Sequence, residues 1–172
     1  MRNRVKIMGI LNITPDSFYD GNSNHSINYF HKKLKSIEES HIIDIGCESS
    51  RPGSIPISST KEVDRLNSFL PILSNYKDKR FSIDTYKFDV AKLALENKFS
   101  IVNDITAGQS DRRMFSLIAQ YNAEVVLMHM QGSPETMQKE PKYDNIIDEL
   151  LSFFSKRIEV AISKGVNEDN II

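Results

Sequence analysis

The chain has little cysteine. Its only cysteine is Cys47, so no intramolecular disulfide can form, and no cysteine cluster with the spacing of a zinc site is present. Proteins that depend on disulfides for stability are therefore excluded. A reducing compartment fits this composition best, and we expect a cytoplasmic protein.

The sequence also lacks a long hydrophobic run and an excess of charge of one sign. No apolar run is long enough to span a membrane, and the N-terminal run is too brief for a signal peptide. With 22 basic and 23 acidic residues, the net charge of -1 gives no reason to expect nucleic acid or a membrane surface as a partner. The 172 residues, 40% of them hydrophobic, predict a single soluble domain over residues 1–172.

Five short apolar runs, rich in isoleucine and valine, recur along the chain. Their near-continuous hydrophobicity predicts strands that are buried on both faces. The runs are residues 6–11, 41–45, 81–83, 100–102 and 124–128.

Segments with the apolar spacing of helices separate these runs. One helix is predicted to be capped by Ser59, because Glu62 follows three residues later and completes a capping-box pattern, and Pro71 should kink or shorten it. A later helix is predicted to have its cap at Ser110, and the last one to end at Gly165.

The alternation of strands and helices predicts an α/β fold with a parallel sheet, either doubly wound or closed into a barrel. No G-x-G-x-x-G follows the first run, as a doubly wound nucleotide-binding sheet would often show. Polar residues instead recur at the C-terminal end of each run, which favours a TIM-type (β/α)8 barrel. They are Asn12, the segment 46–51, Asp84, Asn103 with Asp104, and His129.

The chain is too short for a complete barrel of this type. Only about the first five of eight β/α units are present, and residues 170–172 read as the start of a sixth strand. We therefore expect a barrel domain that is incomplete at its C-terminus, in a chain that is a fragment of a longer protein.

Two loops are candidates for ligand binding. Turn-forming residues from Pro15 to Gly21 follow Asn12, and a long loop of that kind is usually functional or disordered. After the second run, Arg51 and the neighbouring hydroxyl of Ser50 could hold a diphosphate; the alternative is a surface turn with a solvated arginine.

Asp84 and Asn103 end two successive runs, so in a barrel both would point into the top of the central cavity. There they could read the donor edge of a heterocycle. The alternative is that Asp84 caps the next helix and Asn103 satisfies a loop amide. We interpret Asp44 as part of a buried hydrogen-bond network, and Cys47 and His129 as structural.

Five segments, in this order and spacing, resemble the dihydropteroate synthase family. They are LNITPDSFYDG, IIDIGCESSRPG, FSIDTYK, IVNDITAG and VVLMHMQGSPETMQ. The resemblance implies a (β/α)8 barrel that joins 6-hydroxymethyl-7,8-dihydropterin diphosphate to 4-aminobenzoate, giving 7,8-dihydropteroate and diphosphate with the help of Mg²⁺. It also implies a family of sulfonamide targets, and it admits a homodimer for a full-length parent.

The resemblance assigns roles to residues at the strand ends. Asn12 matches the family asparagine near the diphosphate and the metal, and Asp84 and Asn103 match the pterin-binding pair. Met128 matches a residue of the pocket wall.

The resemblance assigns further roles in the two loops. Phe18 and Asp20 match the family's first loop, and Ser50, Arg51 and Pro52 match the second; together these loops build the aminobenzoate site over the bound diphosphate. Departure of diphosphate leaves positive charge on the pterin methylene, which the Asp20 carboxylate would stabilise while Arg51 and Mg²⁺ hold the leaving group. Asp20 and Arg51 are therefore the expected catalytic residues.

The sequence departs from the family pattern in two ways. Ser50 stands where the family usually has threonine, and Cys47 replaces a small residue. The family's later motifs, which lie after strands six, seven and eight, are absent from these 172 residues. We expect negligible turnover from this chain alone and a competent synthase in a longer parent.

Two alternatives stay open from the sequence. A related pterin-binding methyltransferase barrel would share a pocket of the Asp84 and Asn103 type without needing the two loops. A non-catalytic, truncated remnant would bind pterin weakly or fail to fold alone.

Overall fold

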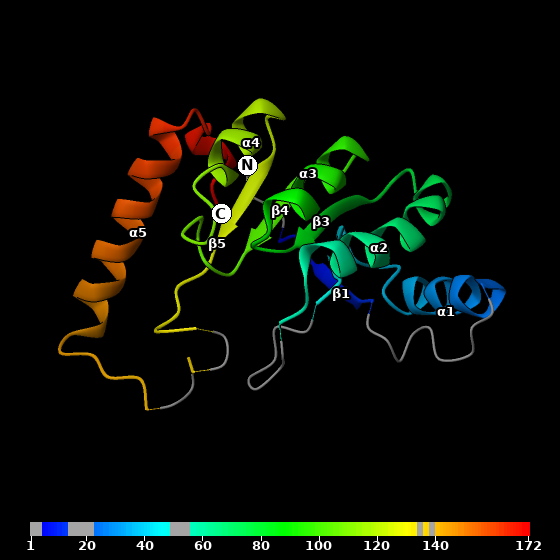
Figure 1. Cartoon of the computed structure of the whole chain (residues 1–172), viewed down its shortest axis with the longest axis horizontal. Helices are drawn as coiled ribbons and strands as arrows, with labels where there is room; N and C mark the ends of the chain where they lie inside the picture. The colour runs from blue at the N-terminus through cyan, green and yellow to red at the C-terminus, as the bar shows by residue number, and fades with distance from the viewer. Residues whose placement is uncertain (1–4, 14–22, 49–55, 134–135, 138–139) are drawn as a thin grey trace.

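The computed structural model describes residues 5–13, 23–48, 56–133, 136–137 and 140–172 (Figure 1). One parallel sheet, with strands in the order β1-β2-β3-β4-β5, organises this part of the chain. The strands are β1 Met8–Asn12, β2 Ile42–Gly46, β3 Arg80–Asp84, β4 Ile101–Asp104 and β5 Glu124–Leu127. All five predicted strands are confirmed, with ends that differ by at most two residues.

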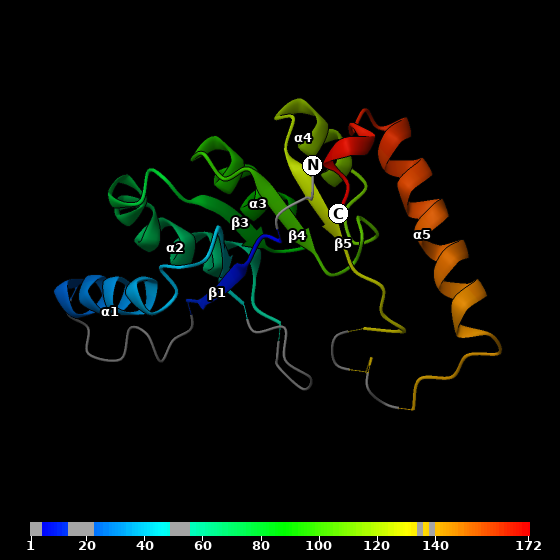
Figure 2. The same ribbon diagram turned by 180° about the vertical axis from the view of Figure 1, so that it is seen from behind.

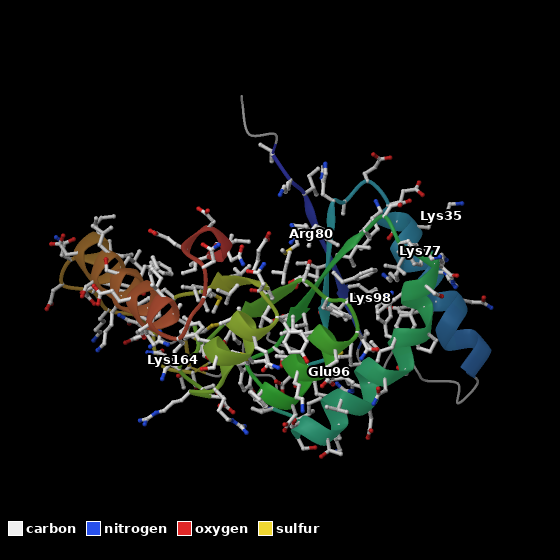
Figure 3. All side chains as sticks on the ribbon, turned by 90° about the horizontal axis from the view of Figure 1, so that it is seen from above. Lys35, Lys77, Arg80, Glu96, Lys98 and Lys164 are labelled. Carbon is white, nitrogen blue, oxygen red and sulfur yellow. The ribbon has the colours of Figure 1, made fainter. Side chains whose placement is uncertain are left out.

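The strand order confirms the predicted α/β class and its TIM-type arrangement. Each strand pairs in parallel with the next one in sequence, whereas a doubly wound sheet reverses its order at a switch point. Helices connect the strands and form an arc on the outer side of the sheet, which Figure 2 shows from behind and Figure 3 from above. They are α1 Ser23–Ser36, α2 Ser59–Phe69, α3 Phe88–Glu96, α4 Met114–Gln120 and α5 Ile146–Ser163, with the 3₁₀ helices η2 Leu70–Asn75 and η3 Glu168–Asn170.

Residues 171–172 continue the sheet beyond β5. Ile171 forms a parallel bridge with Val125, and the Ile172 N–H donates to the Val125 carbonyl at 2.8 Å. The Leu127 N–H donates in turn to the Ile172 carbonyl at 3.0 Å. The predicted start of a sixth strand is confirmed for residues 171–172, whereas Asn170 is the last residue of η3.

The hydrophobic core lies between the sheet and the arc of helices. Alternate strand residues such as Leu11, Ile45 and Ile83 are buried there. Phe30 of α1 and Phe69 of α2 meet edge to face with ring centroids 5.5 Å apart. Because strand side chains alternate between faces, the remaining strand residues point to the inner side of the sheet.

Two predicted capping residues, Ser59 and Ser110, are wrong. The side chain that caps α2 is Ser58, whose Oγ accepts the Lys61 N–H, and Glu62 turns away from the helix start toward Lys87. Ser110 does not cap α4, because the Asp111 side chain accepts the Arg113 N–H and a turn separates Ser110 from the first helical residue.

The two predicted helix interruptions are confirmed. The α2 helix ends at Phe69 and gives way to η2, with Pro71 in its first turn, where the missing N–H costs least. After α5, Gly165 has φ +93°, the left-handed conformation that ends many helices. In the described part of the chain, every helix is too short or too polar to cross a membrane.

A hollow of about 470 Å³ lies at the N-terminal ends of the strands, lined by Lys6 and by residues 38–42 and 78–80. Figure 3 looks onto this end, where the labelled Arg80 begins β3. Two of its charged groups have partners: Lys79 donates to the Ser40 carbonyl at 2.9 Å, and Arg80 pairs with Glu124 at 3.0 Å. Polar strand-end residues gather at the opposite end.

Candidate functional site

The sheet register brings the predicted strand-end residues together in one row. Asn12 is paired with Gly46, Gly46 with Asp84, and Asp84 with Asn103. Paired residues of neighbouring parallel strands project to the same face, and this face is the inner one because Leu11, Ile45 and Ile83 project to the helices. The structure therefore places Asn12, Asp84 and Asn103 side by side on the inner face.

Gly46 makes room within this row. A Cβ atom at this position would lie 2.6 Å from Asn12 Oδ1 and 3.7 Å from Asp84 Oδ2. The first distance is shorter than any ordinary contact, so the Asn12 amide occupies the space that a side chain at residue 46 would fill. The sequence placed Gly46 at a strand end but did not predict its close approach to Asn12, although a glycine at the end of a buried strand often marks such an approach.

Asp44 holds the Asn103 side chain. Asn103 Nδ2 donates to Asp44 Oδ2 at 3.0 Å, and Asp44 lies two residues before Gly46 on the same inner face, only 4% exposed. This contact confirms the predicted buried network and fixes the plane of the Asn103 amide. The amide of Asn103 thus faces the row in one orientation.

The alternative roles of Asp84 and Asn103 are not what the structure shows. The N-cap of α3 is Lys87, without a side-chain capping bond, and its N–H donates to Thr85 Oγ1 at 3.2 Å. Asn103 bonds to Asp44 rather than to a loop amide. Both side chains therefore lie on the inner face, and neither has the role that this alternative gives it.

Burial raises the pKa of two carboxyl groups at this site, those of Asp84 and Asp44. Burial, with the charges of Asp44, Glu62, Asp104 and Glu48 adding to it, raises the pKa of Asp84 to about 7. Burial also raises the pKa of Asp44, although hydrogen bonds from Ser82 and Asn103 partly offset this effect. A ligand that donates hydrogen bonds or carries positive charge would favour the ionised Asp84 and lower its pKa.

A second cluster, which we call the loop-base network, lies beside the row. It consists of Glu48, Lys87 and Glu62: Lys87 Nζ pairs with Glu48 Oε2 at 2.9 Å and with Glu62 Oε2 at 2.7 Å. Burial by itself lowers the pKa of Lys87, but hydrogen bonds and charges of the two carboxylates outweigh it, so the pKa is raised and the ammonium stays charged. Sequence reasoning missed the network because its members come from three separate segments.

Comparison with known proteins identifies the family. A family model described as a pterin binding enzyme matches residues 8–172. The chain belongs to the pterin-binding enzymes. A dihydropteroate synthase from Synechocystis sp. is 37% identical over 171 residues, which are 98% of this chain and 59% of that protein.

Solved structures of pterin-binding enzymes match the fold closely. A dihydropteroate synthase from Clostridium difficile, solved in the presence of pteroic acid, has a TM-score of 0.86 and 38% identity over 98% of this chain and 62% of that one. Another from Xanthomonas albilineans, with 4-aminobenzoic acid, has a TM-score of 0.84 and 30% identity over 98% and 60% of the two chains. The pterin-binding chain thus spans about 60% of the length of these relatives.

The remaining predicted site residues divide into two groups. Met128 directly follows β5, and strand alternation places it on the face of Val126, which is paired with Asn103. The expected catalytic residues Asp20 and Arg51, and the loop residues Phe18, Ser50 and Pro52, lie outside the described residues and stay predictions.

The strand-end row offers one candidate oxygen for a hard cation, the side-chain oxygen of Asn12. Among the described residues, no group of three or more His, Cys, Asp and Glu side chains could hold a metal ion. Asn12 Oδ1 is a single neutral oxygen at a strand end. Mg²⁺ commonly takes one or two protein oxygens and completes its shell with water and substrate phosphates, so Asn12 fits it only together with a phosphorylated ligand.

Cys47 and His129 have structural surroundings, as predicted. Cys47 is fully buried, and burial raises the pKa of its thiol, so the thiolate needed for nucleophilic chemistry is disfavoured. His129 packs edge to face on Phe153 with ring centroids 4.8 Å apart.

Proposed function

We propose that the natural protein containing this chain is a dihydropteroate synthase. The proposal is that it condenses 6-hydroxymethyl-7,8-dihydropterin diphosphate with 4-aminobenzoate, giving 7,8-dihydropteroate and diphosphate. The observation that carries the proposal is the single row of Asn12, Asp84 and Asn103, in a chain whose relatives of that name are up to 39% identical.

The row suits a pterin in its hydrogen-bonding pattern. The Asp84 carboxylate accepts from neighbouring ring and amino N–H groups, while the Asn103 amide both donates and accepts. Because a bound donor favours the ionised carboxylate, pterin binding lowers the pKa of Asp84 from about 7 and releases a proton when the site was protonated. Met128 supplies an apolar wall at the end of β5.

The diphosphate would lie toward Asn12. This residue is the proposed protein ligand of Mg²⁺, which when bound neutralises charge on the diphosphate. Arg51 is expected to hold the leaving group and Asp20 to face the positive charge that develops on the pterin methylene. The amine nitrogen forms a bond to this carbon, the carbon–oxygen bond breaks with its electron pair leaving on diphosphate, and the amine proton passes to solvent.

Two further features are part of this proposal. A cytoplasmic location is proposed, and the single buried cysteine, Cys47, is compatible with a reducing compartment. A homodimer of the natural protein is a further proposal, which the family resemblance admits and which sedimentation of that protein would test.

Turnover by the natural protein tests the function. With dihydropterin diphosphate, 4-aminobenzoate and Mg²⁺, we expect diphosphate release that requires both organic substrates, and Asp84→Ala should lose most of it. Lys92→Ala, a change in an exposed ion pair of α3, is the control and should leave the rate unchanged. Absence of diphosphate release would contradict the proposal, and methyl transfer from a pterin-linked donor would support the methyltransferase alternative.

A further inference from the structure

The loop-base network joins the two ends of the segment 49–55. Glu48 precedes this segment and Ile57 follows it, and the Ile57 N–H donates to Glu48 Oε1. The other oxygen of the same carboxylate, Oε2, accepts from Lys87 Nζ at 2.9 Å. One carboxylate therefore ties both ends of the segment to each other and to Lys87, just before α3.

Helix α2 anchors the network from its outer side. Glu62 accepts from the same ammonium at 2.7 Å and is only 1% exposed. One turn further along α2, Arg65 Nη1 donates to the Cys47 carbonyl at 2.7 Å, immediately before Glu48. The α2 and α3 helices lie side by side, so the network spans two neighbouring helices and the end of β2 (Figures 1 and 2).

The network supplies fixed geometry rather than much stability. The three charged side chains are at most 15% exposed, and loss of hydration at such sites offsets most of the attraction between the charges. The hydrogen bonds of Glu48, Lys87 and Glu62 are directional, so they are satisfied by only one placement of the two loop ends. The exposed pair Lys92–Glu96, at 3.9 Å, lacks both properties.

We propose that Glu48, Lys87 and Glu62 are positioning residues: they fix the two ends of the segment 49–55, which carries Ser50, Arg51 and Pro52. By fixing these ends, they influence how efficiently the enzyme uses 4-aminobenzoate. This inference rests on the proposed function. The three residues act on turnover through the loop ends. Substitution of these residues should change the Michaelis constant for 4-aminobenzoate and the turnover number. It should leave dihydropterin binding at Asp84 and Asn103 nearly unchanged.

Two measurements on the natural protein test this proposal. The first is hydrogen exchange of the Ile57 amide, which needs no activity. Exchange should be faster by tenfold or more in Glu48→Ala and in Lys87→Met, and unchanged in the control Lys92→Met. The second is steady-state kinetics, with binding of 6-hydroxymethyl-7,8-dihydropterin, which lacks the diphosphate, as the reference for the pterin row.

In Lys87→Met we expect kcat/KM for 4-aminobenzoate to fall by tenfold or more, while the dissociation constant of the dihydropterin changes less than threefold. Lys87→Arg keeps a cation between the two carboxylates and should recover part of the loss. An unchanged Ile57 exchange rate would overturn the connection between the loop ends. Faster exchange with unchanged kinetics would overturn the positioning role. If the wild-type protein makes no product, the proposed function fails, and the Ile57 exchange rate still decides whether the loop ends are held.

Discussion

Asp84 combines burial with the close presence of other carboxylates, and both raise its pKa to about 7. A carboxyl group with this pKa is poised to change its charge near neutral pH when a ligand approaches. In the proposed synthase it would accept hydrogen bonds from the pterin. Its environment also has a consequence for the unliganded protein.

The stability of the protein should depend on pH through Asp84. The folded-state pKa of about 7 lies above the ordinary value of 3.8, so the stabilising contribution of the protonated group is complete below about pH 4 and is lost as the pH rises through 7. Asp84→Asn has no such titration. Between pH 4 and pH 8, the wild type should therefore lose up to about 4 kcal/mol of unfolding free energy relative to Asp84→Asn. Urea unfolding at several pH values measures this difference, and parallel curves for the two proteins would refute it.

Gly46 offers a second test at a single residue. In Gly46→Ala the new methyl group would meet Asn12 Oδ1, so the Asn12 amide must move out of the row. We expect affinity for the dihydropterin diphosphate with Mg²⁺ to fall by about tenfold or more, and affinity for the dihydropterin without diphosphate to fall much less. Calorimetric titration of both ligands checks this, and equal losses would remove Asn12 from the diphosphate end of the site.

The sequence predicted the residues of the row but not the contacts that hold or surround them. Asp84 and Asn103 follow apolar runs, and strand ends in a parallel sheet meet at one edge, so their proximity could be predicted. The close approach of Asn12 to Gly46 and the contact of Lys87 with Glu62 depend on register and helix placement. No periodic pattern in the sequence encodes such distances.

At the scale of elements, the start of α2 shows why the capping residue of a helix is difficult to predict from the sequence. Ser58 and Ser59 are adjacent and chemically identical, so the capping pattern alone does not decide between them. The structure does so because Ser58 has extended backbone, with ψ 152°, and accepts the Lys61 N–H. The same reasoning applied to Ser110 failed because Asp111 forms the turn before α4.

The α2 cap gives a paired test of stability. Ser58→Ala removes the acceptor for the Lys61 N–H and should lower the unfolding free energy by about 1 kcal/mol. Ser59→Ala is the matched control, since the Ser59 hydroxyl makes only an exposed bond to Asp89 at 3.3 Å. Denaturant unfolding should show the larger loss for Ser58→Ala; equal losses would mean that both serines serve the helix start.

At the scale of the whole molecule, the inner face of the sheet carries the row of Asn12, Asp84 and Asn103 and also an exposed apolar residue. Ile10 of β1 lies on this face and is 66% exposed. The relatives are longer, and this chain covers about 60% of them. The fold class could be predicted from the alternating runs. The exposure of Ile10 could not, because it depends on which groups pack against the inner face of β1.

The isolated 172-residue chain should therefore associate through its exposed apolar surface. We expect sedimentation at micromolar concentration to show oligomers or aggregates, and Ile10→Lys to reduce them, because a charged side chain opposes burial of the inner face. A wild-type chain that sediments as a monomer and unfolds cooperatively would contradict this expectation.

The most direct test of the central claim, that the strand-end row of Asn12, Asp84 and Asn103 is a pterin site, is calorimetric titration of the natural protein with 6-hydroxymethyl-7,8-dihydropterin diphosphate in the presence of Mg²⁺. We predict saturable binding in wild type and in Lys92→Ala, with affinity lost by tenfold or more in both Asp84→Ala and Asn103→Ala. Binding that is equally strong in all four proteins would contradict the claim.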